Sequence, residues 1–292
     1  MTRFTVIQTS NFNGLNRFRS EGPAAMIPIL QQRQDLGFNS LRDWTAFDLP
    51  LIGRSVPDED LYRAIPDYLD LCAQFDLYVE ITAFTGPYPF FPTQSSMIDH
   101  WERLITVLAD CSNLLDLEAV NEGDNGPNLG VPLDHLRRPP FLASHGSNSQ
   151  DSTPVEPHWD VAGYRSPTTE WWRKTSHNAM EFAALWNVPV WTNEFPRTDH
   201  EPNPAHWEDA GAAGALLCAG PGCFHAPEGK NATIFGGPTT TCAQAFVRGA
   251  RSVPLEFQAG VYSRLEPNPP GVLRVYRRTL SDGRFHEVQV RA

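Results

Sequence analysis

Two segments far apart in the sequence each end in a glutamate that could act as a proton donor or a nucleophile. The first, residues 117–125, is an apolar run followed by Asn121, Glu122 and a polar stretch with glycine. The second, residues 188–196, is a β-branched and aromatic run that closes on Glu194. Both runs are typical of short buried strands, and the switch to polar residues marks where they stop. We therefore expect both glutamates at strand ends.

Two carboxyl groups that face each other across a cleft suit the cleavage of a glycosidic bond. One must be protonated to assist the leaving oxygen, and the other must be ionised to attack or stabilise the positively charged sugar. A single glutamate at a strand end is more often a surface or ion-pair residue. Two at matching positions, one of them preceded by Asn121, favour a shared catalytic site.

Two histidines, His145 and His225, also fall at predicted strand ends and could contact a sugar or, less readily, a metal. The first predicted strand has no His-x-His, and the sequence has no H-E-x-x-H motif. We therefore expect no metal and no cofactor. Trp44 and Trp159 follow or precede predicted strands and are candidate platforms on which a sugar ring could stack.

The strands that would position these residues alternate with helices along the chain. Runs with strand character occupy residues 5–8, 39–44, 77–82, 117–121, 141–145, 160–164, 188–193 and 222–225. Helical spacing is found in residues 24–36, 58–75, 96–112, 132–138, 169–186 and 207–218, whereas residues 11–22 and 146–157 read as loops.

Eight parallel strands with intervening helices predict an α/β protein with a (β/α)8 TIM barrel, assigned to residues 1–253. A doubly wound open sheet is the competing fold, but no G-x-G-x-x-G or G-x-x-x-x-G-K-[ST] motif follows any strand. Residues 254–292 have a different pattern, with three strand-like runs and no helical spacing between them. The turn sequence at 281–283 joins the last two runs as a hairpin. We expect a small antiparallel β-sheet extension packed on the barrel.

Composition restricts the class of partner. The 292 residues carry a net charge of −11, which opposes binding to nucleic acid or to an anionic membrane. No apolar run is long enough to span a bilayer, and the first residues lack a signal-peptide core. The prediction is a cytoplasmic protein by default, or a chain whose export signal has been removed. The five cysteines indicate buried thiols more than disulfides, with a bridge between Cys223 and Cys242 as a minor alternative.

The strand-end residues resemble those of the retaining glycoside hydrolases of clan A, a (β/α)8 superfamily that includes cellulases, mannanases, β-galactosidases and arabinofuranosidases. The resemblance implies that Glu122 is the acid/base and Glu194 the nucleophile. It also implies that Arg42 lies near the nucleophile and that Tyr164 hydrogen-bonds it. Arg42 and Tyr164 would keep Glu194 ionised, whereas burial and a like charge nearby would raise the pKa of Glu122.

Several positions depart from the pattern of this superfamily. The third predicted strand lacks the histidine often found at its end, Ala162 stands where a histidine is common, and His225 stands where a tryptophan is usual. These departures leave the specific family and the sugar open. They also motivate an alternative function, a carbohydrate-binding or virion-type barrel that has lost activity.

The predicted function is a retaining glycosidase acting on an oligosaccharide or polysaccharide with β or arabinofuranosyl linkages. The oligomeric state is not predicted. Besides the two glutamates, the expected substrate-binding residues are Arg42, Trp44, Asn121, His145, Tyr164 and His225. Asn121 would hydrogen-bond the sugar hydroxyl next to the reacting carbon, a contact that strengthens in the transition state.

Overall fold

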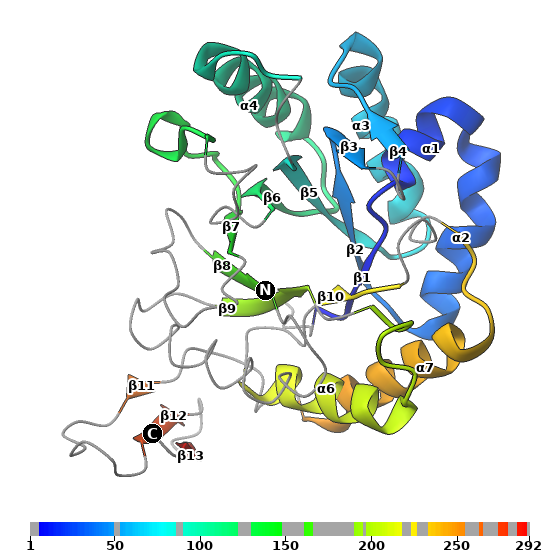
Figure 1. The fold of residues 1–292 in the computed structure, drawn as a ribbon, viewed down its shortest axis with the longest axis vertical. Helices are drawn as coiled ribbons and strands as arrows, with labels where there is room; N and C mark the ends of the chain where they lie inside the picture. The colour runs from blue at the N-terminus through cyan, green and yellow to red at the C-terminus, as the bar shows by residue number, and fades with distance from the viewer. Residues whose placement is uncertain are drawn as a thin grey trace.

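The computed structural model gives the fold of most of the chain (Figure 1). It describes residues 6–49, 53–85, 90–121, 130–147, 161–165, 190–194, 197–217, 223–226, 233–254, 263–264, 274–279 and 285–290. Only the backbone is described for residues 145–147, 161–165, 190–194, 216–217 and the last three of those ranges. Glu122, Trp159 and the helix predicted at residues 169–186 lie outside the described residues.

Eight parallel strands form one sheet in the order β10-β1-β2-β5-β6-β7-β8-β9. Their bounds are β1 Gln8–Ser10, β2 Ser40–Trp44, β5 Tyr78–Phe84, β6 Leu114–Val120, β7 Ala143–Ser147, β8 Val161–Arg165, β9 Val190–Glu194 and β10 Cys223–Phe224. The predicted (β/α)8 class is confirmed. The two end strands are not joined by a ladder of hydrogen bonds. A single parallel bridge between Arg197 and His225 links the residues that follow them.

Helices cover the outer side of this sheet (Figure 1). They are α1 Gly14–Glu21, α2 Pro23–Leu36, α3 Glu59–Ala73, α4 Gln94–Leu108, α6 Pro204–Leu217 and α7 Gly237–Ser252, and a 3-10 turn spans Leu133–His135. Gly37 ends α2 in a left-handed conformation with φ of 93°, which a glycine adopts without steric cost. The 3-10 turn replaces the short helix predicted at residues 132–138. No helix among the described residues has the length and apolar character needed to cross a membrane.

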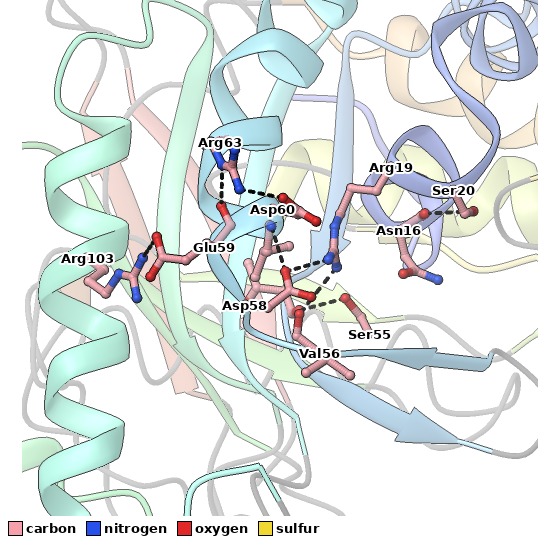
Figure 2. Close-up of polar contacts among 12 residues, drawn as sticks. Asn16, Arg19, Ser20, Ser55, Val56, Asp58, Glu59, Asp60, Arg63 and Arg103 are labelled. Carbon is pink, nitrogen blue, oxygen red and sulfur yellow. Dashed lines mark hydrogen bonds and ion pairs between the residues drawn. The ribbon is translucent and has the colours of Figure 1, made fainter.

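The start of α3 shows how sequence signals fix a helix and tie it to its neighbours (Figure 2). Asp58 caps the helix by accepting a hydrogen bond from the backbone N–H of Leu61 at 2.9 Å. Arg19 of α1 donates to the Asp58 carboxylate at 2.5 Å, and Arg103 of α4 donates to Glu59 at 2.6 Å (Figure 2). These surface pairs link helices α1 and α4 to the start of α3.

The prediction of a loop at residues 11–22 is wrong, because α1 occupies Gly14–Glu21. The signal that starts α1 comes from β2 and is invisible in the local sequence: the Asp43 carboxylate accepts from the backbone N–H of Leu15 at 3.1 Å. Burial of Leu15 then anchors the helix. Tyr68 of α3 donates to the same carboxylate at 2.5 Å, so Asp43 joins two helices to the outer face of β2.

Two further elements were not predicted. Helix α7 begins at a Gly-Gly-Pro sequence that reads as a loop, although proline is favoured in a first helical turn. A two-stranded antiparallel hairpin, β3 Phe47–Leu49 with β4 Gly53–Ser55, follows β2. The first strand lies at Gln8–Ser10, later than the predicted residues 5–8, and its polar side chains Gln8 and Thr9 form buried hydrogen bonds.

The apolar core lies between the sheet and the helices. Alternate strand residues Leu41, Ile81 and Leu117 are fully buried in one cluster with residues of α2, α3 and α4. A second cluster contains Phe224, Trp207 of α6 and Phe246 of α7. Helices α6 and α7 approach very closely at two glycines. A Cβ on Gly249 would lie 1.8 Å from the carbonyl oxygen of Glu208, and one on Gly211 would lie 2.1 Å from that of Phe246.

The C-terminal strands β11 Ser263–Arg264, β12 Arg274–Thr279 and β13 Phe285–Val290 form the antiparallel sheet that the sequence predicted. Among the described cysteines, Cys72, Cys111, Cys223 and Cys242 are free thiols, so Cys223 and Cys242 form no bridge. Packing of the small sheet on the barrel stays a prediction.

Candidate functional site

The inner face of the first strands is lined by polar side chains. Gln8 on β1 donates to Glu80 on β5 at 2.6 Å, and Arg42 on β2 donates to Glu118 on β6 at 2.6 Å. Each of these bonds passes over an intervening strand, which is possible only on the concave side of the sheet. All four side chains are buried. The interior of this part of the barrel is therefore a hydrogen-bonded network, whereas TIM-barrel interiors are more often filled by branched apolar residues.

Arg42 lies at the centre of the network. Its Nε is 3.0 Å from Oε1 of Glu80, and its Nη2 is 2.6 Å from Oε2 of Glu118. Thr82 donates to the same Glu118 oxygen at 2.5 Å. Nη2 also donates to Oδ1 of Asn121 at 2.8 Å, at the end of β6. The guanidinium thus connects two buried carboxylates to the residue that precedes Glu122.

The network holds more carboxyl groups than one guanidinium can neutralise. Burial raises the pKa of Glu80 well above its usual range, the charges of Asp116 and Glu118 raise it further, and Arg42 lowers it. Burial likewise raises the pKa of Asp116 to about 8, although a hydrogen bond from Ser144 lowers it. At least one of these carboxyl groups is therefore protonated at neutral pH.

These pKa shifts predict how stability depends on pH. The folded state keeps a proton on Asp116 up to about pH 8, whereas the unfolded chain, with a usual pKa of 3.8, releases it. The free energy of unfolding should therefore fall as pH rises, by about 2 kcal/mol between about pH 6 and pH 8 for this group, and level off above its folded pKa. Urea unfolding at several pH values measures this slope.

Asp116→Asn is the variant that isolates this contribution. An asparagine keeps an oxygen that can accept from Ser144 but binds no proton, so the slope of stability against pH should be shallower than in the wild-type protein. Asp43, whose pKa burial raises to about 7, would supply part of the remaining slope. An unchanged slope in Asp116→Asn would show that Asp116 is ionised in the folded state.

Trp44 and His225 lie in an aromatic group at the carboxyl ends of β2 and β10. The Trp44 ring stacks on Phe12, with centroids 4.0 Å apart and planes 6° apart, and Phe47 meets it edge-on. Phe12 thus covers one face of the indole, so that face cannot stack on a sugar. His225 is also buried and contacts Phe12, with ring centroids 5.1 Å apart.

Arg42 joins the aromatic group to the polar network, since its guanidinium carbon lies 5.5 Å from the Phe12 ring centroid. Arg42, Trp44, Asn121 and His225, four of the six predicted substrate-binding residues, therefore belong to one connected group. The other two, His145 on β7 and Tyr164 on β8, have a described backbone, and their side chains lie outside the described part of the chain.

The two predicted catalytic residues belong to the carboxyl ends of β6 and β9. Asn121 directly follows β6, and Glu122 is the next residue, outside the described residues. Glu194 is the last residue of β9, where its backbone pairs with that of Arg165. Because β6 and β9 are parallel strands of one sheet, the ends of both strands lie on the same rim. The catalytic roles of the two side chains stay predictions.

Sequence reasoning missed Glu80, Asp116 and Glu118. A signal was present: polar and apolar residues alternate in 80–83 and 116–119, and a strand of a barrel whose outer face is covered by helices must turn its polar alternate residues inward. Among the residues with described side chains, no group of three or more His, Cys, Asp or Glu is arranged to hold a metal ion.

Comparison with known proteins gives structural matches only. No family model matches the sequence, and no curated protein matches it. A GH5_18 protein from Streptomyces cattleya, solved with GlcNAc, has a TM-score of 0.62 and 14% identity over 93% of this chain and 84% of its own. A GH5_18 protein from Bifidobacterium longum subsp. infantis has a TM-score of 0.62 and 13% identity, over 90% of this chain and 81% of its own.

A Glycoside Hydrolase Family 5 mannosidase from Rhizomucor miehei has a TM-score of 0.57 and 12% identity, over 85% of this chain and 94% of its own. The fold of this chain is therefore similar to that of glycoside hydrolases of family 5. At these identities the matches establish the fold alone, and the activity of this barrel has to be argued from its own residues.

Proposed function

We propose that the protein is a retaining glycoside hydrolase in which Glu122 is the acid/base and Glu194 the nucleophile. The observation that carries the proposal is the bond from Arg42 to Asn121, immediately before Glu122 and on the rim to which β9 brings Glu194. The clan A fold supports the same arrangement.

In the proposed reaction Glu194 attacks the anomeric carbon while Glu122 donates its proton to the leaving oxygen, so that a covalent glycosyl-enzyme forms. Glu122 then takes a proton from water, which attacks the same carbon and releases Glu194. Two inversions give net retention. This mechanism requires the two carboxyl groups to lie about 5 to 5.5 Å apart.

The substrate class follows from charge and from the neighbours. A net charge of −11 disfavours anionic partners, so a neutral glycan is proposed. Two related GH5_18 structures, from Streptomyces cattleya and Bifidobacterium longum, are complexes with Manβ1-4GlcNAc, and another neighbour is an exo-β-1,4-mannosidase. A β-mannoside is therefore the first substrate to test.

The test is a screen of nitrophenyl β-mannoside, β-glucoside, β-galactoside and α-arabinofuranoside, together with Manβ1-4GlcNAc. We expect turnover of at least one substrate, and proton NMR should show that the first-formed sugar keeps the anomeric configuration of the substrate. The Glu194→Ala chain is the control for contaminating glycosidase. A first product of inverted configuration would overturn the retaining mechanism. Binding of glycans without turnover of any of them would favour the carbohydrate-binding alternative.

A further inference from the structure

The orientation of the Asn121 amide is set from within the barrel. Arginine has only hydrogen-bond donors, so the Asn121 atom 2.8 Å from Nη2 of Arg42 is the amide oxygen. The amide nitrogen must then point away from Arg42. An asparagine held in this way turns its N–H groups to the side that faces away from the guanidinium.

The position of Arg42 depends in turn on Glu118. Both Nε and Nη2 of Arg42 donate to the same oxygen of Glu118, at 3.1 Å and 2.6 Å. Thr82 donates to that oxygen from the neighbouring strand. All three side chains are fully buried, so they cannot exchange these contacts for water. The chain of contacts from Thr82 through Glu118 and Arg42 to Asn121 is therefore fixed by the fold.

We propose that Glu118 is a positioning residue that acts through Arg42 to hold Asn121 with its N–H groups toward the sugar. This inference rests on the proposed function, because it assigns to Asn121 the contact with the hydroxyl next to the reacting carbon. Glu118 itself touches no substrate. Glu118 should therefore affect catalysis only through the contact between Asn121 and that one hydroxyl. A residue that merely stabilises the barrel would affect all substrates equally.

The experiment compares an aryl glycoside with its 2-deoxy analogue in wild-type, Glu118→Gln and Asn121→Ala proteins. We expect Glu118→Gln to lower kcat/KM on the parent substrate by about 10-fold to 100-fold, the range of a lost hydrogen bond to a developing charge. On the 2-deoxy substrate, which lacks the contact, the loss should be under about 3-fold. Asn121→Ala should show the same selectivity, and the double variant should lose no more than Asn121→Ala alone.

Two further variants keep the test decisive. Thr82→Val removes a hydrogen bond to Glu118 without changing a charge, so it replaces Glu118→Gln if that variant does not fold. Its loss of kcat/KM should again be larger on the parent substrate than on the 2-deoxy substrate, but smaller than the loss in Glu118→Gln. Ser144→Ala removes a buried hydroxyl that contacts Asp116 and should leave the ratio of the two substrates unchanged.

The outcomes separate this inference from the proposed function. Equal losses on both substrates in Glu118→Gln and Thr82→Val would overturn the positioning role and leave the hydrolase intact. A wild-type chain that turns over neither substrate would overturn the proposed function, and the inference with it.

Discussion

Replacing Glu194 with alanine should lower kcat on an aryl glycoside by about 1,000-fold or more, because the covalent intermediate can no longer form. Azide, which is small enough to occupy the space left by the carboxylate, should restore turnover in this variant. It would attack the anomeric carbon from the side opposite the leaving group, and the product would be a glycosyl azide of inverted configuration.

Glu122→Ala should respond differently, and the contrast assigns the two roles. General acid–base catalysis contributes about 100-fold to 10,000-fold, and the loss should shrink on substrates with good leaving groups that need no protonation. Azide would here attack the glycosyl-enzyme in place of water and give the retained glycosyl azide. Glu208→Ala, an exposed residue paired with Arg248 on the outer helices, is the control and should keep wild-type kinetics. If Glu122→Ala gave the glycosyl azide of inverted configuration and Glu194→Ala gave the one of retained configuration, the roles of the two glutamates would be exchanged.

Arg42→Met should destabilise the protein by roughly 3 to 5 kcal/mol, because it leaves buried Glu80 and Glu118 without their cation. The pH dependence identifies the cause. Arg42 lowers the pKa of Glu80 and Asp116, so its removal raises both further, and protons must be released on unfolding over a wider pH range. The stability loss relative to wild type should therefore be smaller at pH 6 than at pH 8.

Arg33→Met is the matched control, since Arg33 is also fully buried but donates to oxygens of Thr233 and Gln32 and lies over the Phe235 ring at 3.4 Å. Burial lowers the pKa of Arg33 to about 9, so it stays charged from pH 6 to pH 8. Its loss of stability should be nearly constant over this range, as followed by urea unfolding. If the loss of stability in Arg42→Met were as constant with pH as that in Arg33→Met, the buried carboxyl groups would not be its cause.

Much of the fold could be read from local patterns because strands and helices here carry their own signals. The alternation of Leu41, Ile81 and Leu117 with polar residues marks strands, and Asp58 with the acidic turn after it marks the start of α3. Helix α1 could not be read in this way, because its cap, Asp43, lies in another element. The start of α7 was hidden by glycines that read as a loop.

The sequence indicated candidate residues at or near strand ends, whereas the pairing of side chains inside the barrel could not be predicted from it. Asn121 and Arg42 were chosen from the resemblance to a known superfamily. The structure places the two side chains in contact, and their roles toward a substrate stay predictions. Glu118 sits only three residues before Asn121, yet its partner Arg42 is 76 residues away, so no local pattern indicates the pair. The stacking of Phe12 on Trp44 is likewise a tertiary contact, and it removes one indole face from the predicted platform.

The charged lining of the barrel also bears on how the strands find their alignment during folding. Arg42 stands opposite Glu80 in the register of β2 and β5, and a slip of two residues would set Ser40 or Trp44 there instead. Such a slip keeps every apolar side chain on its proper face, so hydrophobic burial alone would tolerate it. It would, however, leave acidic groups in the interior with no cation within reach. The buried charges thus disfavour misaligned barrels that apolar packing alone would accept. Burying these charges also lowers the stability of the correctly aligned barrel.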